Sequence, residues 1–249
     1  MASGLTYSCV ATFVGDMGPT AAALATDRFI HRRDPKTIVM LGIAAGIDDV
    51  RLGDVVVANH VGRYLENAKI VPGDKTFEIK PGGDSFPCSQ DLFHATQNFE
   101  FAHSNLHRQW QSSAQALLAK LVPDEPRSKL AEKDWLGSTP RLAEGPIASG
   151  PVVVAAEEFI NWVKSLNRNY LALEMESGAV LSTVYSHSDP TRTMMLRGIS
   201  DFGDARKREL DSIGKGGLRR YAMSNAIGLL WQLMEAGILP RRGGSERPQ

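Results

Sequence analysis

Apolar residues along the chain form short runs that alternate with longer stretches of helical spacing. The run at residues 7–14 is rich in β-branched and aromatic residues and predicts a strand. The alanine-rich stretch 21–30 predicts a helix, and Pro19 suits its start because a missing N–H costs nothing there. Continuous apolar runs at 37–43 and 54–59 predict buried strands. This strand–helix–strand order indicates a βαβ unit.

The second half of the chain repeats this alternation of strand-like and helix-like stretches. We predict strands at 146–154, 170–173 and 193–199, and helices at 155–166, 174–187 and 218–236, with Gly237 as a C-cap. The order of elements predicts an α/β fold, a single-domain three-layer α/β/α architecture around a mostly parallel central mixed sheet.

The segment at about 61–142 is less regular and is expected to be an insertion in a domain that covers residues 1–240. Two strand-like stretches, 63–70 and 75–80, flank a Pro-Gly-Asp turn and predict a hairpin. A helix is predicted at 106–122, followed by a polar, proline-containing connection at 123–140. Residues 241–249 are polar and are expected to be a disordered tail.

Composition excludes several classes of function. The 28 basic and 28 acidic residues cancel, which argues against a nucleic acid polymer as partner because such binding needs a net basic field. Cys9 and Cys88 are the only cysteines, so a disulfide framework is excluded and a reducing, cytoplasmic location is expected. No apolar run approaches the length of a membrane span, and the first residues do not resemble a secretory signal, so no membrane association is expected.

Chemistry in parallel α/β sheets takes place beyond the carboxyl ends of the strands. Four segments place unusual residues at such ends: 42–46, 148–153, 174–176 and 200–201. A single acidic residue there is more often a helix cap than a catalyst. Two acidic segments together with two glycine-containing turns favour a site.

Those segments also carry a family resemblance. The sequences ALEMESGA at 172–179 and RGISD at 197–201, with IAAGI at 43–47 and LGDVVV at 52–57, resemble the purine nucleoside phosphorylase and methylthioadenosine/adenosylhomocysteine nucleosidase superfamily. The sequence GPIASG at 145–150 is most similar to phosphorylase-like effector domains of bacterial and fungal sensor proteins. The resemblance covers about residues 7–236. It implies a nucleoside-phosphorylase-like fold, no cofactor, a small-molecule nucleoside or nucleotide as ligand, and a homo-oligomer.

The resemblance also implies catalytic residues. Asp201 would protonate or hydrogen-bond N7 of a leaving purine, and its place after a buried strand suits a carboxyl that donates a proton near neutrality. Ser200 would fix the loop around it. Glu176 would hold the ribose 2′- and 3′-hydroxyls, and Met175 would pack against the sugar. Glu174 is either a substrate-binding acid or a helix cap.

Further substrate-binding positions are implied by the same resemblance. The purine base would lie against Val153 and Val154, where the family often has an aromatic residue, so the base preference stays open. The remaining positions are Gly42, Ile43 and Ala44 in the glycine turn, and Gly18, which ends a glycine-containing turn that suits either an anion or ribose hydroxyl or tight packing.

Two departures from the family pattern bear on the reaction. Hexameric phosphorylases carry a phosphate-binding arginine at the position of Met40, and a serine is common at Ile43, so water is favoured over phosphate as nucleophile. The family's water-orienting acid lies on its first strand, which this chain is expected to lack. Hydrolytic release of a base from a purine nucleoside or nucleotide is therefore expected. The alternatives are phosphorolysis, or a catalytically weakened nucleoside-binding or oligomerisation module of a sensor or defence system.

Two other groups of polar residues have side chains that bind ligands in other proteins. His103 and His107 form an i, i+4 pair without an evident third ligand, so a solvated helix face and no metal are expected. Arg206, Lys207 and Arg208 either meet the phosphates of a nucleotide or form a solvated run.

Overall fold

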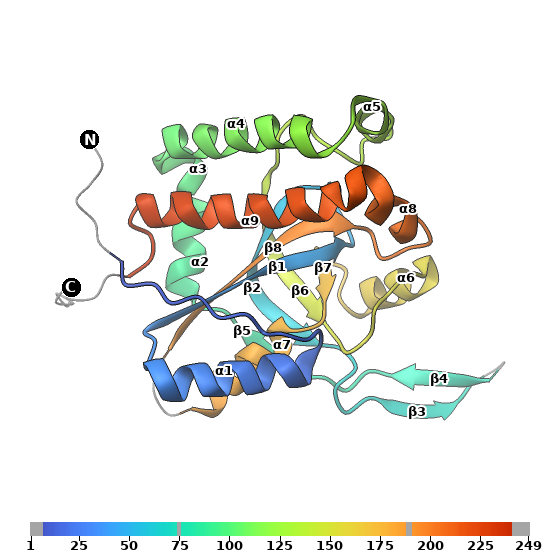
Figure 1. The fold of residues 1–249 in the computed structure, drawn as a ribbon. Helices are drawn as coiled ribbons and strands as arrows, with labels where there is room; N and C mark the ends of the chain where they lie inside the picture. Colours follow the sequence, from blue (N-terminus) through green and yellow to red (C-terminus); the bar gives the residue numbers. More distant parts are fainter. Residues whose placement is uncertain (1–6, 74–75, 188–190, 241–249) are drawn as a thin grey trace.

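The computed structural model describes residues 7–73, 76–187 and 191–240 (Figure 1). Its strands are β1 Thr37–Gly46, β2 Val55–Arg63, β3 Lys69–Pro72, β4 Phe77–Lys80, β5 Ser85–Pro87, β6 Leu142–Ser149, β7 Ala172–Glu174 and β8 Arg192–Asp201. Its helices are α1 Pro19–Arg33, α2 Gln90–Gln97, α3 Phe99–Ala102, α4 Ser104–Leu121, α5 Asp124–Glu132, α6 Glu157–Leu166, α7 Ser177–Ser186, α8 Lys207–Ser212 and α9 Gly217–Glu235, with a 3₁₀ turn at Ile213–Lys215.

The central sheet is mixed and closes on itself. Its order is β5-β2-β6-β7-β1-β8, and β2 also pairs with β8, so β2, β6, β7, β1 and β8 form a ring. Three pairings are parallel (β1–β8, β2–β6, β6–β7) and three are antiparallel (β1–β7, β2–β8, β2–β5). The predicted mixed sheet is therefore confirmed, but the prediction that it is mostly parallel is wrong. A helical crossover sets the direction of strands that follow each other, such as β6 and β7, but not the direction in which distant strands such as β1 and β7 meet.

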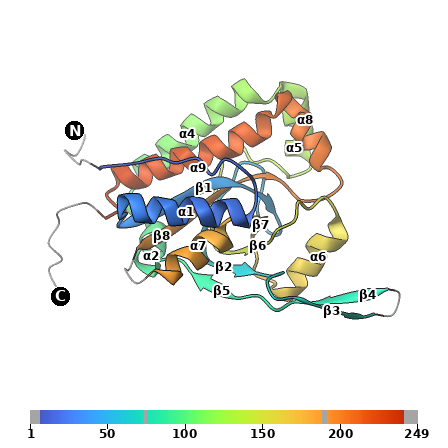
Figure 2. The same cartoon turned by 60° about the horizontal axis from the view of Figure 1, so that its bottom comes forward.

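Helices cover both faces of the sheet (Figures 1 and 2). On β1, Ile38 and Ala44 belong to the core beneath α1 and α7, whereas Val39 and Leu41 pack into the core beneath α9 and α4. This alternation follows from the two-residue repeat of a strand, and a strand buried on both sides reads as a continuous apolar run. The α/β class expected from the sequence is confirmed.

The prediction of a strand at residues 7–14 is wrong. This segment crosses the outside of the molecule ahead of α1 (Figure 1) and is mostly exposed, with Phe13 88% accessible. It is held at its start by the Tyr7 hydroxyl, which donates hydrogen bonds to the carbonyls of Met234 and Leu239, each at 3.1 Å. Strand propensity does not make a strand without a neighbouring edge to take its backbone hydrogen bonds.

The segment at 61–142 contains more structure than the sequence predicted. The predicted hairpin is present as β3 and β4, although residues 74 and 75 lie outside the described part, and the helix at 106–122 is confirmed as α4. The predicted connection at 123–140 contains α5, because Asp124 and Glu125 occupy its first turn and Lys129 pairs with Glu125 at 2.8 Å.

Elements α2, α3 and β5 were not predicted, and one further expectation for this segment is wrong. His107 is not on a solvated face: it is 4% exposed and its ring lies against those of Phe99 and Trp110. Within the described ranges, no helix combines the length and the apolarity that a membrane crossing needs.

The two cysteines lie in opposite environments, and we expect them to differ in reactivity. Cys9 is exposed, whereas Cys88 is buried and burial raises the pKa of its thiol to about 12. Because the thiolate is the reactive form, a disulfide reagent at about pH 8 should modify Cys9 quickly and Cys88 only after unfolding. Titration of thiols with Ellman's reagent, with Cys9→Ser as control, measures this. Rapid labelling of native Cys9→Ser would contradict the prediction.

Candidate functional site

The strand ends that the sequence singled out meet at one end of the ring. Ala45 of β1 pairs with Leu173 of β7 on one side and with Asp201 of β8 on the other. On β6, Ser149 pairs with Glu174 of β7. The prediction that these four segments form one candidate site agrees with this register, because β6, β7, β1 and β8 are consecutive neighbours in the sheet.

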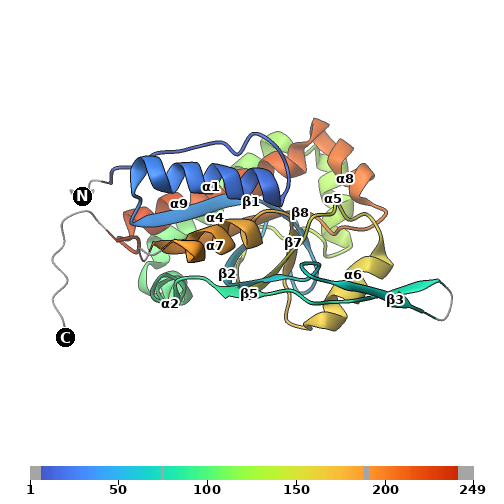
Figure 3. The ribbon, with the colours of Figure 1, turned by 90° about the horizontal axis from the view of Figure 1, so that it is seen from below.

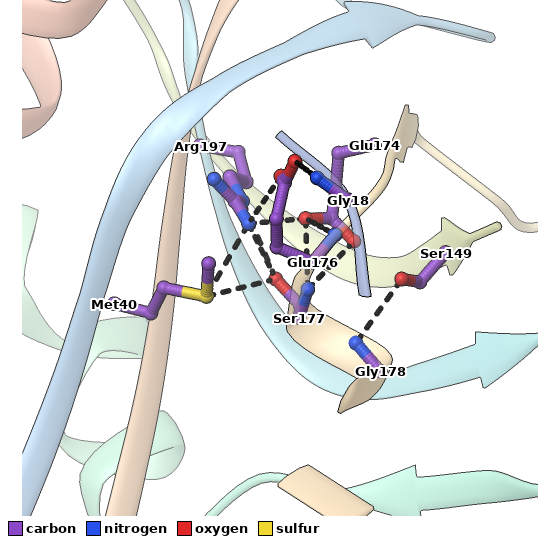
Figure 4. Close-up of polar contacts among 8 residues, drawn as sticks. All are labelled: Gly18, Met40, Ser149, Glu174, Glu176, Ser177, Gly178 and Arg197. Carbon is purple, nitrogen blue, oxygen red and sulfur yellow. Dashed lines mark hydrogen bonds and ion pairs between the residues drawn. The ribbon is translucent and has the colours of Figure 1, made fainter. Parts of the chain in front are cut away.

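A buried ion pair lies at the centre of the site (Figure 4). The Arg197 guanidinium donates to Glu174, and the two side chains are only 3% and 1% exposed. Arg197 Nη2 also donates to Ser177 Oγ at 2.9 Å and lies 3.3 Å from the sulfur of Met40. A charge this deeply buried persists only when it is paired and hydrogen-bonded, and here both conditions hold.

Gly42 makes room for this arginine. The two residues are paired across β1 and β8, and a Cβ at Gly42 would lie 1.6 Å from Arg197 Nη1. Gly42, Ile43 and Ala44 lie within β1, so the expectation that they form a glycine turn is wrong. The glycine has a packing reason instead: any side chain at 42 would displace the guanidinium from Glu174.

We expect Gly42→Ala to destabilise the protein by about 1–3 kcal/mol, the usual cost of overpacking a core. Urea unfolding measures the change. The matched comparison is the same substitution in Arg197→Met, where the added methyl meets no guanidinium and should cost less. An equal cost in both backgrounds would contradict the steric explanation.

Glu174 closes the N-terminus of α7. Its carboxylate accepts the backbone N–H of Glu176 at 3.0 Å and that of Ser177 at 2.9 and 3.1 Å, while Ser149 Oγ accepts the N–H of Gly178 at 3.1 Å. These are the donors that the first turn of a helix leaves free. The geometry fits the helix-cap alternative for Glu174, and its burial leaves little room for contact with a ligand.

Glu176 is the acid of this segment that reaches solvent. Its side chain is 18% exposed, its Oε1 accepts the buried N–H of Gly18 at 3.0 Å, and its Oε2 lies 3.6 Å from Arg197 Nη2. The turn before α1, which has φ 101° at Gly18, is thereby held against the start of α7. The structure brings Gly18 and Glu176 together, as a shared binding role requires.

Asp201 ends β8 and is enclosed by donors. Its Oδ2 accepts the hydroxyl of Ser200 at 2.9 Å and the ammonium group of Lys207 at 2.6 Å, and its Oδ1 accepts the N–H of Gly203 at 2.9 Å. The residue is 1% exposed. Ser200 thus holds the carboxyl in place, and Lys207 pairs with Asp201 instead of forming part of a solvated basic run.

The other predicted residues lie at or near the same strand ends. Ala44 is buried, and its carbonyl accepts the Ser200 hydroxyl at 3.4 Å. Met175 is half-buried beside Glu174, and Val154 belongs to a core cluster that includes Leu173.

Two predicted residues have no described contact with the carboxylates of Glu174, Glu176 and Asp201. Val153 is 60% exposed. Ile43 pairs with Gly198 and, by alternation along β1, faces away from the Arg197 side chain.

Two residues that contact the predicted carboxylates, Arg197 and Lys207, are missing from the site predicted from the sequence. The signal for Arg197 was present in the sequence: an arginine inside the apolar run TMMLRGI requires a buried acidic partner. Lys207 gave no such signal, because three adjacent basic residues read equally well as a surface run.

Known proteins are similar to this chain over most of its length. A family model described as the phosphorylase superfamily matches residues 4–234. ATP nucleosidase Cap17 of Escherichia coli is 27% identical over 201 residues, which are 80% of this chain and 37% of Cap17. An uncharacterized protein of Sinorhizobium fredii is 27% identical over 228 residues, 89% of this chain and 51% of that protein. The chain spans about a third to a half of the length of these curated relatives.

Solved structures share the fold. The 5′-methylthioadenosine/S-adenosylhomocysteine nucleosidase of Neisseria meningitidis, in complex with methylthio-immucillin-A, gives a TM-score of 0.58 at 18% identity, over 88% of this chain and 78% of that one. Futalosine hydrolase of Helicobacter pylori gives 0.56 at 19% identity, over 88% and 77%. At this identity the likeness concerns the arrangement of the backbone.

Proposed function

Because the chain belongs to the phosphorylase superfamily, we propose that it cleaves the N-glycosidic bond of a purine nucleoside or nucleotide by hydrolysis and releases the free base. The observation that carries this is the register at the end of β1, where Ala45 lies between Asp201 and the strand that leads into Glu176. Two carboxyl groups at one site, one deeply enclosed and one open to solvent, suit the two tasks of glycosidic cleavage.

Glu176 is proposed to bind the sugar. A carboxylate accepts two hydrogen bonds from vicinal hydroxyls and favours the positive charge that a ribosyl group acquires as the bond breaks. The Gly18 N–H fixes one of its oxygens and Arg197 lies on the other side. Met175 adjoins Glu176 and supplies apolar contact to the sugar in this proposal.

Asp201 is proposed to assist departure of the base. Protonation or a hydrogen bond at the purine N7 makes the base a better leaving group. The hydroxyl of Ser200, the N–H of Gly203 and the ammonium of Lys207 hold the carboxyl at the end of β8. We assign Lys207 as a positioning residue that acts through Asp201.

Water is favoured over phosphate by the surroundings of Arg197. In the described part of the site, this arginine lies against two carboxylates, Glu174 and Glu176, and against the thioether of Met40. A phosphate dianion brought here would face both carboxylates. Like charges at short range repel each other by several kcal/mol in a poorly solvated site.

A nucleotide substrate is supported by the relatives named as ATP nucleosidases, and a nucleoside by the fold shared with methylthioadenosine nucleosidases. The proposed unit is the single domain over residues 1–240, with an insertion at about 61–142, acting without a cofactor as a cytoplasmic homo-oligomer. Light scattering after size exclusion tests the oligomer.

A base-release assay tests the reaction. ATP, AMP, adenosine, inosine and methylthioadenosine are incubated with and without phosphate, and free base is measured by chromatography. We expect base release that needs no phosphate. A requirement for phosphate would replace hydrolysis by phosphorolysis. A nucleoside-induced rise in Tm without turnover of any substrate would favour a binding module instead.

A further inference from the structure

Helices α1 and α7 lie side by side and run in the same direction (Figure 3). At their beginnings, the N–H of Gly18 bonds to Glu176 of the candidate site. At their other ends, Asp27 and His31 of α1 meet His187, which directly follows α7. The pair of helices therefore carries a second cluster of titratable side chains, which lies towards the C-terminal ends of both helices, away from Glu176.

The spacing of these three side chains fits a metal ion. One possible ligand atom of each lies within 4.8 Å of those of the other two. Asp27 Oδ1 is 3.4 Å from His31 Nδ1 and 3.2 Å from His187 Nε2. In a tetrahedral zinc site with bonds of about 2.0–2.1 Å, neighbouring ligand atoms are about 3.3 Å apart.

Hydrogen bonds to Asp27 hold each ring: His31 Nδ1 contacts the Asp27 carbonyl at 2.9 Å, and His187 Nε2 contacts Asp27 Oδ1 at 3.2 Å. These two bonds do not account for the approach of the carboxylate to His31. The 3.4 Å separation exceeds the usual N–H···O distance of about 2.9–3.0 Å, so the carboxylate bonds poorly to His31 while it lies between both rings. The rings are edge to face, with centroids 5.1 Å apart. The side chains of Asp27, His31 and His187 are 50%, 67% and 23% exposed, so an ion from solution can reach them.

We propose that Asp27, His31 and His187 bind one divalent transition-metal ion of the zinc class, which joins α1 to α7. Two imidazoles and one carboxylate suit zinc, whereas magnesium and calcium prefer oxygen ligands. Water completes the fourth position. Both histidines bind as neutral rings, so His31 Nδ1 exchanges its 2.9 Å contact with the Asp27 carbonyl for the metal.

This site has no signature in the sequence. Asp27 and His31 are an i, i+4 pair on one helix, but His187 lies more than half the chain away and reaches them only through the packing of α7 on α1. Joining the far ends of the helices restrains their movement past each other. It thereby also restrains the Gly18–Glu176 bond at the near ends.

Metal titration tests the site. The chelator-treated protein is titrated with Zn²⁺ by calorimetry, and with Co²⁺ by visible absorption, which reports coordination geometry. We expect one ion per chain, and at least about tenfold weaker binding in Asp27→Asn and in His187→Gln. His94→Gln, which removes an exposed histidine on α2, is the matched control and should bind as the parent protein does. Unchanged binding in His187→Gln, or no binding by the parent protein, would overturn the site.

Amide hydrogen exchange tests the connection between the helices. Zn²⁺ should slow exchange of the peptide that contains Gly18 in the parent protein and leave it unchanged in His187→Gln. Metal binding without slower exchange would overturn the proposed restraint. Neither readout requires enzymatic turnover, so their failure is separate from failure of the proposed reaction.

Discussion

Asp201→Asn is expected to lower kcat for base release by about 10²–10⁴-fold, the usual contribution of a positioned acid or base. Asparagine has the same shape and its amide oxygen still accepts one of the hydrogen bonds from Ser200 or Gly203. It carries no exchangeable carboxyl proton for N7. The substitution also frees Lys207, which is 24% exposed and can be hydrated, so the fold should persist. Initial rates under saturating substrate, with near-UV circular dichroism, measure both effects.

Asp204→Asn is the matched control. Asp204 lies in the same loop, and its carboxylate accepts a hydrogen bond from the Arg206 guanidinium. This hydrogen bond lowers the pKa of the Asp204 carboxyl. Among the described residues, no hydrogen bond or ion pair joins the Asp204 side chain to Asp201, Glu174 or Glu176, so kcat should be nearly unchanged. Equal loss of activity in both variants would show that the loop is disrupted and would contradict a specific role for Asp201.

Elements with strong periodicity were predictable from the sequence, but their partners were not. The apolar run of β1 and the helical spacing of α9 are read correctly because local burial determines both patterns. Residues 7–14 have the same composition as a strand and form none, since composition does not say whether a sheet edge is available. The antiparallel contact of β2 with β8 closes the ring and depends on directions that no local pattern encodes.

The neighbourhood of the four segments was predictable from the sequence, whereas the contacts of their side chains were not. The rule that ligands bind beyond strand ends singled out four segments, and the register of the strands makes them neighbours. Two glutamates two residues apart look alike in sequence. Only packing distinguishes Glu174, which caps α7 and pairs with Arg197, from Glu176, which faces Gly18 and solvent.

Arg197→Met is expected to have the largest effect on stability, a loss of about 3–5 kcal/mol in the free energy of unfolding. Methionine keeps much of the side-chain volume but leaves the buried carboxylate of Glu174 without its cation. The cost is thus mainly that of one uncompensated buried charge. The double variant Arg197→Met/Glu174→Gln should recover part of the loss, because a neutral amide oxygen still accepts the N–H of Ser177.

The comparison that isolates burial is Arg51→Met. Arg51 pairs with Asp134 at 2.6 Å, but the side chains are 34% and 76% exposed, and exposed ion pairs contribute about 0–1 kcal/mol. Urea unfolding at neutral pH should therefore separate the two arginine variants widely. If Arg197→Met costs no more than Arg51→Met, or if the double variant is no more stable than Arg197→Met, the pair does not organise this site. The start of α7, and with it Glu176, would then be held by Ser149 and Gly18 instead.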